Sequence, residues 1–164
     1  MKKEPFGELV IDNQDSWYRI AKSYLRDDAD CADAIQSAIV QAFDSLHTLR
    51  NDQYAKTWFV RILINECHKI IRKNQKVVSL DGYQEEGRVS EAIDGFGQYS
   101  DLYESIMQLK EQERTSILLY YFEGYSIKEI AQCMDSTESA IKKRLVRGRE
   151  HLRTLIKENV RYGY

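Results

Sequence analysis

Proline occurs once in the chain, at Pro5, so almost the whole sequence lacks the residue that most strongly ends helices. After Pro5, apolar residues recur at intervals of three and four, which places them on one face of a helix. The first such face consists of Trp17, Ile20, Ala21, Tyr24 and Leu25. Two further helices follow, the second over about residues 54–73, with inward positions at Ile35, Ile39, Phe43 and Leu46 and then at Phe59, Ile62, Leu63, Cys67 and Ile70. No alternating pattern typical of strands occurs, so the sequence predicts an all-α fold.

The stretch from Val77 to Ser100 interrupts this pattern. It contains four of the eight glycines, and its charged residues are mostly acidic. Glycine-rich sequence without apolar periodicity is typical of flexible linkers. Helical patterns resume at about Asp101, and one later helix has an apolar face of Ile117, Leu118, Tyr121 and Phe122 before Gly124. We therefore predict two small helical domains, residues 1–76 and 101–164, joined by a flexible acidic linker over residues 77–100.

Composition narrows the possible chemistry. The net charge is −2 and the pI is about 6.0, so any DNA binding must come from local basic clusters. The three cysteines form no CxxC motif, which predicts a reducing, cytoplasmic location without disulfides. Cys67 and His68 are adjacent, which is not the spacing of a zinc-ligand pair, so we expect no metal and no cofactor. We expect no targeting leader, because no apolar run follows Lys2 and Lys3, and no membrane span, because every apolar run is too short.

An enzyme is the least favoured class of protein. The histidines, at His47, His68 and His151, lie in three separate segments. The sequence contains no recognisable nucleophile with a neighbouring base, no carboxylate pair and no glycine-rich phosphate loop. We therefore expect a binding protein without catalytic activity.

The segment from Ser126 to Leu145 carries the strongest local motif. Ser126 and Glu129 have the spacing of a capping box, in which each residue satisfies a backbone N–H of the other. Asp135 and Ser136 then predict a tight turn, and Thr137 is expected to cap the next helix. Two helices joined in this way are typical of a helix-turn-helix, whose second helix enters the DNA major groove.

The second helix of this pair, over about residues 138–157, has one apolar and one basic side. Ile141, Leu145 and Leu152 are expected to point inward, whereas Glu138, Ser139, Lys142 and Lys143 point outward. Seven cations and two acids give the segment a net charge of +5. An ordinary helical hairpin with a solvated basic face would show the same periodicity, and the pattern alone leaves that alternative open.

Two more surfaces have polar residues at helical spacing. The helix over residues 54–73 carries a basic strip that continues past its end, with Trp58 and Arg61 followed by Asn65, Lys69, Arg72, Lys73 and Lys76. Cations interleaved with an aromatic ring can hold a nucleic-acid backbone and stack an unpaired base. The preceding helix presents acidic and polar residues with one apolar residue among them, at Asp33, Gln36, Ser37, Val40, Gln41 and Asp44, which suits a protein partner. A plain solvated surface remains the alternative for both.

Three segments in this order resemble bacterial sigma factors of the extracytoplasmic-function group. They read WYRIAKSYLRDDADCADAIQSAIVQAFDSL from Trp17, KTWFVRILINECHKIIRK from Lys56, and YSIKEIAQCMDSTESAIKKRLVRGREHLR from Tyr125. The resemblance covers nearly the whole chain, from about Ser16 to Lys157. Length and spacing also resemble the sigma-V-like, envelope-stress branch. Ile64, Lys69 and Asp135 depart from residues common in the family, and we expect the helix-turn-helix to survive the last of these changes.

The resemblance implies a specificity factor that directs core RNA polymerase to promoters. The first segment would dock on core polymerase through Asp33, Gln36, Ser37 and Val40. The −10 element would be melted and read by Trp58, Arg61, Asn65, Lys69, Arg72 and Lys73, with the loop over residues 47–55 capturing a flipped base. The −35 element would be bound by Thr137, Glu138, Ser139, Lys142, Lys143, Arg144, Arg147 and Arg149.

The resemblance further implies that a membrane-anchored anti-sigma factor holds the protein inactive. The competing hypothesis is an ordinary helix-turn-helix repressor or activator, which would use the same C-terminal half and bind duplex DNA alone, as a dimer. The long asymmetric N-terminal half and the absence of a leucine-rich pairing helix disfavour it.

Overall fold

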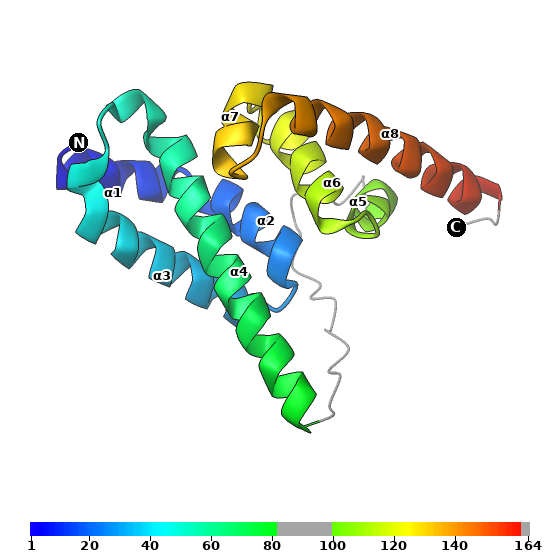
Figure 1. Cartoon of the computed structure of the whole chain (residues 1–164), viewed down its shortest axis with the longest axis horizontal. Helices are drawn as coiled ribbons and strands as arrows, with labels where there is room; N and C mark the ends of the chain where they lie inside the picture. Colours follow the sequence, from blue (N-terminus) through cyan, green and yellow to red (C-terminus); the bar gives the residue numbers. More distant parts are fainter. Residues whose placement is uncertain (82–99, 162–164) are drawn as a thin grey trace. The chain divides into compact units, whose positions relative to one another are not determined.

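The computed structural model describes residues 1–81 and 100–161, and within those ranges it contains helices and turns without strands, as predicted. The helices form two compact units (Figure 1). The first unit contains two 3-10 turns and four helices: α1 (Lys3–Asp12), α2 (Gln14–Leu25), α3 (Asp28–Ser45), η1 (Leu46–Thr48), η2 (Asp52–Tyr54) and α4 (Ala55–Asp81). The second contains α5 (Ser100–Met107), α6 (Glu111–Ile117), the π-helical turn η4 (Leu118–Phe122), most of α7 (Ile127–Cys133), and α8 (Glu138–Arg161).

Helix α1 was not predicted from the sequence. Pro5 lies in its first turn, where a missing backbone N–H costs nothing because that N–H has no partner within the helix. Phe6 is fully buried, and its ring meets Phe43 edge-on at a centroid distance of 5.0 Å. Its ring also lies 6.1 Å from those of Trp58 and Phe59. Aromatic contacts with α3 and α4 therefore hold α1 in place.

Helices α2, α3 and α4 pack against one another to form the core of the first unit. Trp17 stacks on Phe59 at a centroid distance of 3.8 Å. On α3 the fully buried positions are small residues, Cys31, Ala34, Ala38 and Ala42, which allow close approach of the neighbouring helices. The predicted inward residues of α3, Ile35, Ile39 and Phe43, are only half-buried along the edge of this face. The sequence thus predicted the helix correctly but not the centre of its buried face.

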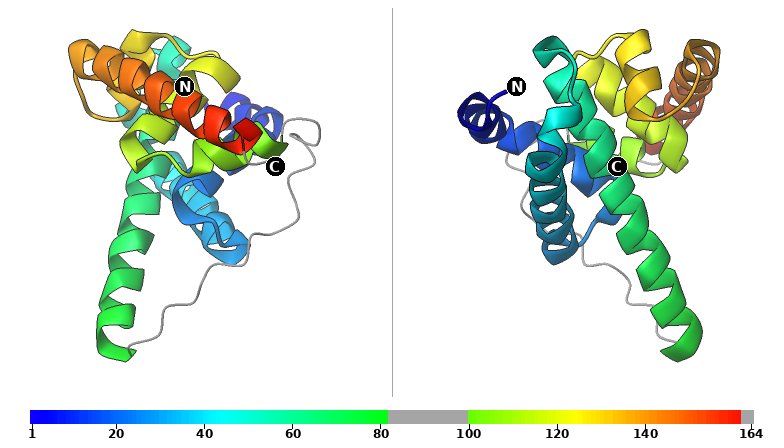
Figure 2. Two further views of the ribbon diagram at one scale, coloured as in Figure 1. Left: turned by 90° about the vertical axis from the view of Figure 1, so that its right-hand side faces the viewer. Right: turned by 60° about the vertical axis from the view of Figure 1, so that its left-hand side comes forward.

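Helix α4 is longer than predicted. It continues to Asp81, so residues 77–81 of the predicted linker are helical. Its C-terminal end projects beyond α2 and α3, as both views in Figure 2 show, and Arg72 to Val77 are all exposed. Residues 82–99, the rest of the predicted linker, lie outside the described residues.

The second unit is built on the contact between α6 and α8, with α5 packed against both. Ile117 of α6 and Ile141 and Leu145 of α8 are buried. The two helices approach most closely at Gly148, where an added Cβ would lie 2.9 Å from Cγ1 of Ile117. The guanidinium of the buried Arg114 donates hydrogen bonds to the carbonyls of Met107 and Leu109, which ties α6 to the end of α5.

The turn η4 corrects one sequence expectation. Tyr121 and Phe122 were predicted on a buried face, yet they are 52% and 37% exposed. A π-helical turn has more residues per turn than an α-helix, so the α-helical period used for the prediction fails across it. Gly124 then takes a left-handed conformation, with φ of 71°, between η4 and the helix-turn-helix.

Candidate nucleic-acid and partner interfaces

The helix-turn-helix begins with the predicted capping box. Oγ of Ser126 accepts a hydrogen bond from the backbone N–H of Glu129 at 3.1 Å, and Oε2 of Glu129 accepts one from the N–H of Ser126 at 2.7 Å. The two side chains satisfy N–H groups that have no partner within the helix. Ile130 and Ala131 are buried, whereas Ile127 and Met134 are half-buried. This reciprocal pair fixes where α7 begins.

The turn between α7 and α8 depends on Asp135. Its φ of 51° lies in the left-handed region, which favours glycine but which aspartate adopts more readily than most residues. The N–H of Ser136 donates to the carbonyl of Ala131 at 2.9 Å and closes the turn. Aspartate therefore occupies this position with the helix-turn-helix intact.

Helix α8 begins with a second cap and then separates its two faces. Oγ1 of Thr137 accepts from the N–H of Ala140 at 3.1 Å, as predicted. Ile141 and Leu145 are buried, while Leu152 is half-buried. Among the predicted −35 residues Arg144 is half-buried, and the exposed ones are Thr137, Glu138, Ser139, Lys142, Lys143, Arg147 and Arg149. The first two turns of α8 thus present a polar and basic surface that a groove could accept.

The predicted −10 residues lie along α4 of the first unit. Trp58 is half-buried, and its ring lies in a T-shaped arrangement with that of Phe6 at a centroid distance of 6.1 Å. The other predicted residues are exposed, at Arg61, Asn65, Lys69, Arg72 and Lys73. Nζ of Lys69 pairs with Oε1 of Glu66 at 2.7 Å. The strip is therefore a real exposed surface, and one of its cations is already neutralised in part by a neighbour.

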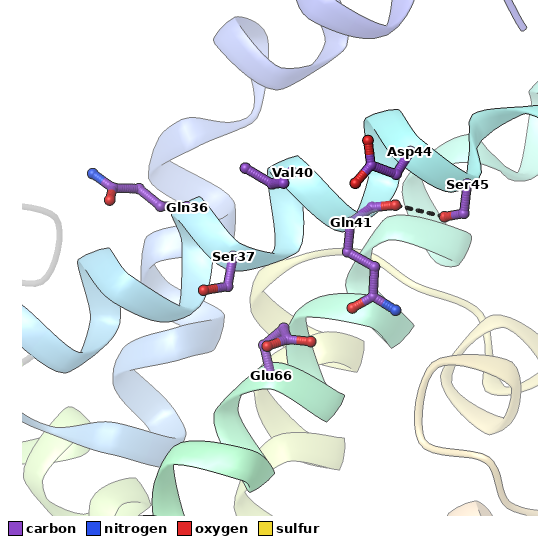
Figure 3. Close-up of a pocket in the computed structure, with 7 residues that line it drawn as sticks. All are labelled: Gln36, Ser37, Val40, Gln41, Asp44, Ser45 and Glu66. Carbon is purple, nitrogen blue, oxygen red and sulfur yellow. Dashed lines mark hydrogen bonds between the residues drawn. The ribbon is translucent and has the colours of Figure 1, made fainter.

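A groove runs between α3 and α4 beside the predicted partner-binding residues (Figure 3). It has a volume of about 630 Å³ and is lined by Gln36, Ser37, Val40, Gln41, Asp44, Ser45 and Glu66. Val40 is 61% exposed in this polar setting. A second hollow of about 310 Å³ continues along the same helices and contains Asp33 with Lys73 of α4. The sequence did not predict that Glu66 lines the groove or that Lys73 lines the second hollow. Both residues lie on α4, whereas the predicted docking residues lie on α3.

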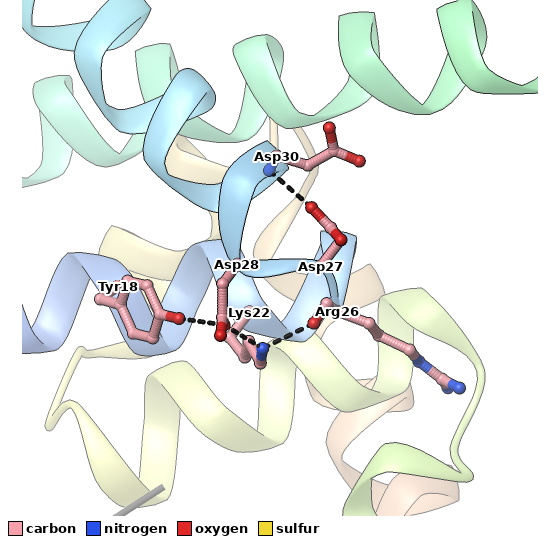
Figure 4. Close-up of polar contacts among 6 residues, drawn as sticks. All are labelled: Tyr18, Lys22, Arg26, Asp27, Asp28 and Asp30. Carbon is pink, nitrogen blue, oxygen red and sulfur yellow. Dashed lines mark hydrogen bonds and ion pairs between the residues drawn. The ribbon is translucent and has the colours of Figure 1, made fainter. Parts of the chain in front are cut away.

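The junction between α2 and α3 sets the direction of α3 (Figure 4). Asp27 caps α3 by accepting from the N–H of Asp30 at 2.9 Å, and Arg26 has a φ of 55°. The buried amine of Lys22 donates to the carbonyl of Arg26 at 2.6 Å and forms an ion pair with Asp28, to which Tyr18 also donates. A buried cation that is paired and hydrogen-bonded resists displacement, because separation would leave a charge without partners.

The cysteines offer no reactive site. All three are buried, and none of them forms a disulfide. Burial raises the pKa of the Cys31 thiol to about 12, and the nearby Asp28 opposes ionisation further, against the effect of Lys22. A thiol that remains protonated is neither a nucleophile nor a metal ligand. Within the described ranges, His, Cys, Asp and Glu form no group of three that could hold a metal ion, and no helix combines the length and apolarity needed to cross a membrane.

Comparison with known proteins agrees with both units. Residues 9–77 match the family described as Sigma-70 region 2, and residues 99–152 match Sigma-70, region 4. The chain is 30% identical over 152 residues to RNA polymerase sigma factor SigV of Bacillus subtilis, covering 92% of this chain and 91% of that protein. It is 24% identical over 173 residues to the ECF RNA polymerase sigma-E factor of Escherichia coli K12, covering 97% and 90%.

Solved structures agree in fold. The sigma factor RpoE of Bartonella quintana, in complex with the anti-sigma factor NepR, aligns with a TM-score of 0.81 at 22% identity, over 94% of this chain and 98% of that one. A helical bundle and a helix-turn-helix in this order define a two-domain transcription specificity factor. The chain belongs to the extracytoplasmic-function group of the sigma-70 family. It directs transcription initiation and is not an enzyme.

Proposed function

We propose that the chain docks on core RNA polymerase through the groove between α3 and α4, reads the −10 element with α4, and binds the −35 element with α8. The observation that carries the proposal is the division of α8 into two faces. Its capped first turns expose Ser139, Lys142 and Lys143, while Ile141 and Leu145 are buried. That arrangement suits a recognition helix, whose N-terminal residues enter a major groove about 12 Å wide.

The −10 role rests on the exposed strip of α4. Arg61, Asn65 and Arg72 are exposed, and their spacing places them on one side of the helix. Such a row of donors can follow a DNA backbone, while Trp58 offers a ring on which an unpaired base can stack. Asn51 caps η2 by accepting from the N–H of Gln53 at 3.0 Å, which gives the loop before α4 a defined form in which to receive a flipped base.

The docking role rests on the groove between α3 and α4. An exposed apolar residue, Val40, lies between the polar Gln36 and Asp44 on α3, and Glu66 of α4 lies on the side of Ser37 and Gln41 (Figure 3). A partner helix with an apolar residue flanked by cations would complement this surface. By resemblance, the coiled coil of the largest polymerase subunit is that partner.

Regulation by an anti-sigma factor is proposed from relatives. RpoE of Bartonella quintana is in complex with the anti-sigma factor NepR, and CnrH is in complex with the cytosolic domain of CnrY, with a TM-score of 0.69 to this chain at 20% identity. We propose that a membrane-anchored anti-sigma factor holds this chain in the same general way. Co-purification of this chain with a protein of the source membrane fraction would support the proposal. The association should be lost when the exposed residues Gln36 and Val40 are both changed to Asp.

Run-off transcription with sigma-free core polymerase and a promoter library tests the function as a whole. We expect wild-type protein to produce defined start sites. Asp33→Arg with Gln36→Arg should abolish both transcripts and association with core polymerase, because two cations replace an acidic and a polar residue at the docking surface. Both positions are exposed, so the fold should be retained, which circular dichroism checks. Retention of core polymerase by the double variant would contradict the docking site.

The −35 contact is tested by salt dependence. Lys142→Ala with Lys143→Ala should weaken promoter binding by the holoenzyme and lower the slope of log K against log salt by about two, since each phosphate contact contributes about one. The exposed Lys110 lies outside the helix-turn-helix, and Lys110→Ala is the matched control. A slope unaltered by the double variant would remove these lysines from the interface.

A further inference from the structure

The exposed Arg149 of α8 has an ordered partner. Its Nη1 donates a hydrogen bond to the hydroxyl of Tyr121 at 3.1 Å. Tyr121 belongs to η4, which precedes the helix-turn-helix, and its side chain is exposed. The contact therefore joins the recognition helix to an element outside the DNA-binding motif. Because the hydroxyl accepts through its oxygen, its own proton is free to be donated elsewhere.

Arg149 lies on the face of α8 that carries Lys142. Ser139, Lys142, Val146 and Arg149 follow one another at intervals of three, four and three, and all four are exposed. Seven residues of helix separate Lys142 from Arg149, which is about 10 Å along the axis. A major groove is about 12 Å wide. A helix whose Lys142 lies in the groove would thus bring Arg149 to the phosphate backbone at its edge.

An exposed arginine without a partner is poorly prepared to bind a phosphate. Its long side chain loses rotamer entropy when it is fixed in one conformation. A hydrogen bond made before binding removes part of that loss, because the guanidinium is already oriented. The Tyr121 hydroxyl supplies this bond and leaves the remaining guanidinium donors available to an anion.

We propose that Tyr121 is a positioning residue that orients Arg149 toward a backbone phosphate at the edge of the −35 groove, where the tyrosine hydroxyl donates to the same phosphate. This inference rests on the proposed function of α8. DNA is favoured as the occupant because the surrounding segment of α8 is basic, and because arginine and tyrosine both contact phosphate oxygens in DNA complexes.

The test uses holoenzyme assembled from the full chain and core polymerase on a promoter fragment found by run-off transcription. Closed-complex binding is followed by fluorescence anisotropy over a series of salt concentrations. Arg149→Ala should lower the slope of log K against log salt by about 0.9, and Arg149→Lys should restore that slope. Tyr121→Phe, which removes only the hydroxyl, should weaken binding about fivefold. In the Arg149→Ala background the same change should have a smaller effect than in the wild-type background, because only the bond from the hydroxyl to the phosphate then remains to be lost.

Tyr120→Phe is the matched control, since it removes the adjacent hydroxyl from the same turn, and it should bind like wild type. The positioning role is overturned if Tyr121→Phe binds like wild type, or if its effect adds in full to that of Arg149→Ala. An unaltered salt slope in Arg149→Ala with weaker association to core polymerase would assign the surface to a protein contact instead. If the variant with Lys142→Ala and Lys143→Ala also binds normally, the −35 assignment itself fails. If that variant alone loses binding, the −35 assignment stands and only the role of Tyr121 and Arg149 is refuted.

Discussion

The small cores of the two units are built from different kinds of side chain. In the first unit the core centres on aromatic rings, with Phe6, Trp17 and Phe59 all buried. In the described part of the second unit the buried apolar side chains are aliphatic, and Arg114 lies buried among them. Large rings bury much area with few rotatable bonds. The second unit relies in addition on caps, on a buried guanidinium and on the close approach at Gly148, so small geometric changes should matter there as well as lost volume.

The largest effect should follow removal of a ring from the first unit. Phe59→Ala should lower its free energy of unfolding by about 3–5 kcal/mol, because Phe59 is fully buried between Phe6 and Trp17. Both tryptophans, Trp17 and Trp58, lie in the first unit, so denaturation followed by tryptophan fluorescence reports that unit.

The matched variant in the second unit is Ile141→Ala, which also truncates a fully buried side chain. It should cost about 2–5 kcal/mol in the transition followed by circular dichroism while leaving the fluorescence transition in place. A shift of both transitions by either variant would show that the units do not unfold independently.

Alkaline pH should affect the first unit through Cys31. The pKa of its thiol is raised from 9.0 to about 12 in the folded chain, so the unfolded chain loses the proton first as pH rises. Stability from this group is complete below pH 9 and is lost between pH 9 and 12, which amounts to about 1.4 kcal/mol at pH 10. Fluorescence-detected denaturation at pH 8 and pH 10 measures it. Cys31→Ala should lose less stability over this interval, and an equal loss would contradict the assignment.

The smallest effects should have opposite signs in the two units. Gly7 of α1 has nothing within 4 Å of an added Cβ, so Gly7→Ala should stabilise by about 0.5–1 kcal/mol through helix propensity. Gly148→Ala gains the same propensity but forces its Cβ against the buried Ile117, and overpacking of this kind costs about 1–3 kcal/mol. We expect a net loss of about 1 kcal/mol, and thermal denaturation would show whether the signs differ.

Local chemistry could be predicted from the sequence, whereas contacts between distant segments could not. The pair of Ser126 and Glu129 and the cap at Thr137 depend on residues three apart, and both were correct. The burial of Phe6 depends on rings more than thirty positions away, so the short helix around it gave no clear signal. The bond between Tyr121 and Arg149 spans 28 positions and follows from a π-helical turn, which α-helical periodicity cannot describe.

On α3 the periodicity allowed two adjacent stripes, one of isoleucine and phenylalanine and one of alanine. Hydrophobicity favoured the larger residues, yet the alanine stripe is the more buried because it lets helices approach closely. The candidate groove was likewise only half predicted, since Glu66 reaches it from α4. The buried stripe of α3 and the lining of the groove both depend on which helices pack side by side, and the sequence does not show this.

The burial of every native thiol has a practical consequence. Maleimide dyes react with accessible thiols, so cysteines introduced at exposed positions would be modified ahead of Cys31, Cys67 and Cys133. Asp12 in α1 and Glu158 in α8 are such positions, one in each unit. Energy transfer between dyes at these two positions would act as a molecular ruler, reporting how far apart the halves of the chain lie before and after polymerase engages them.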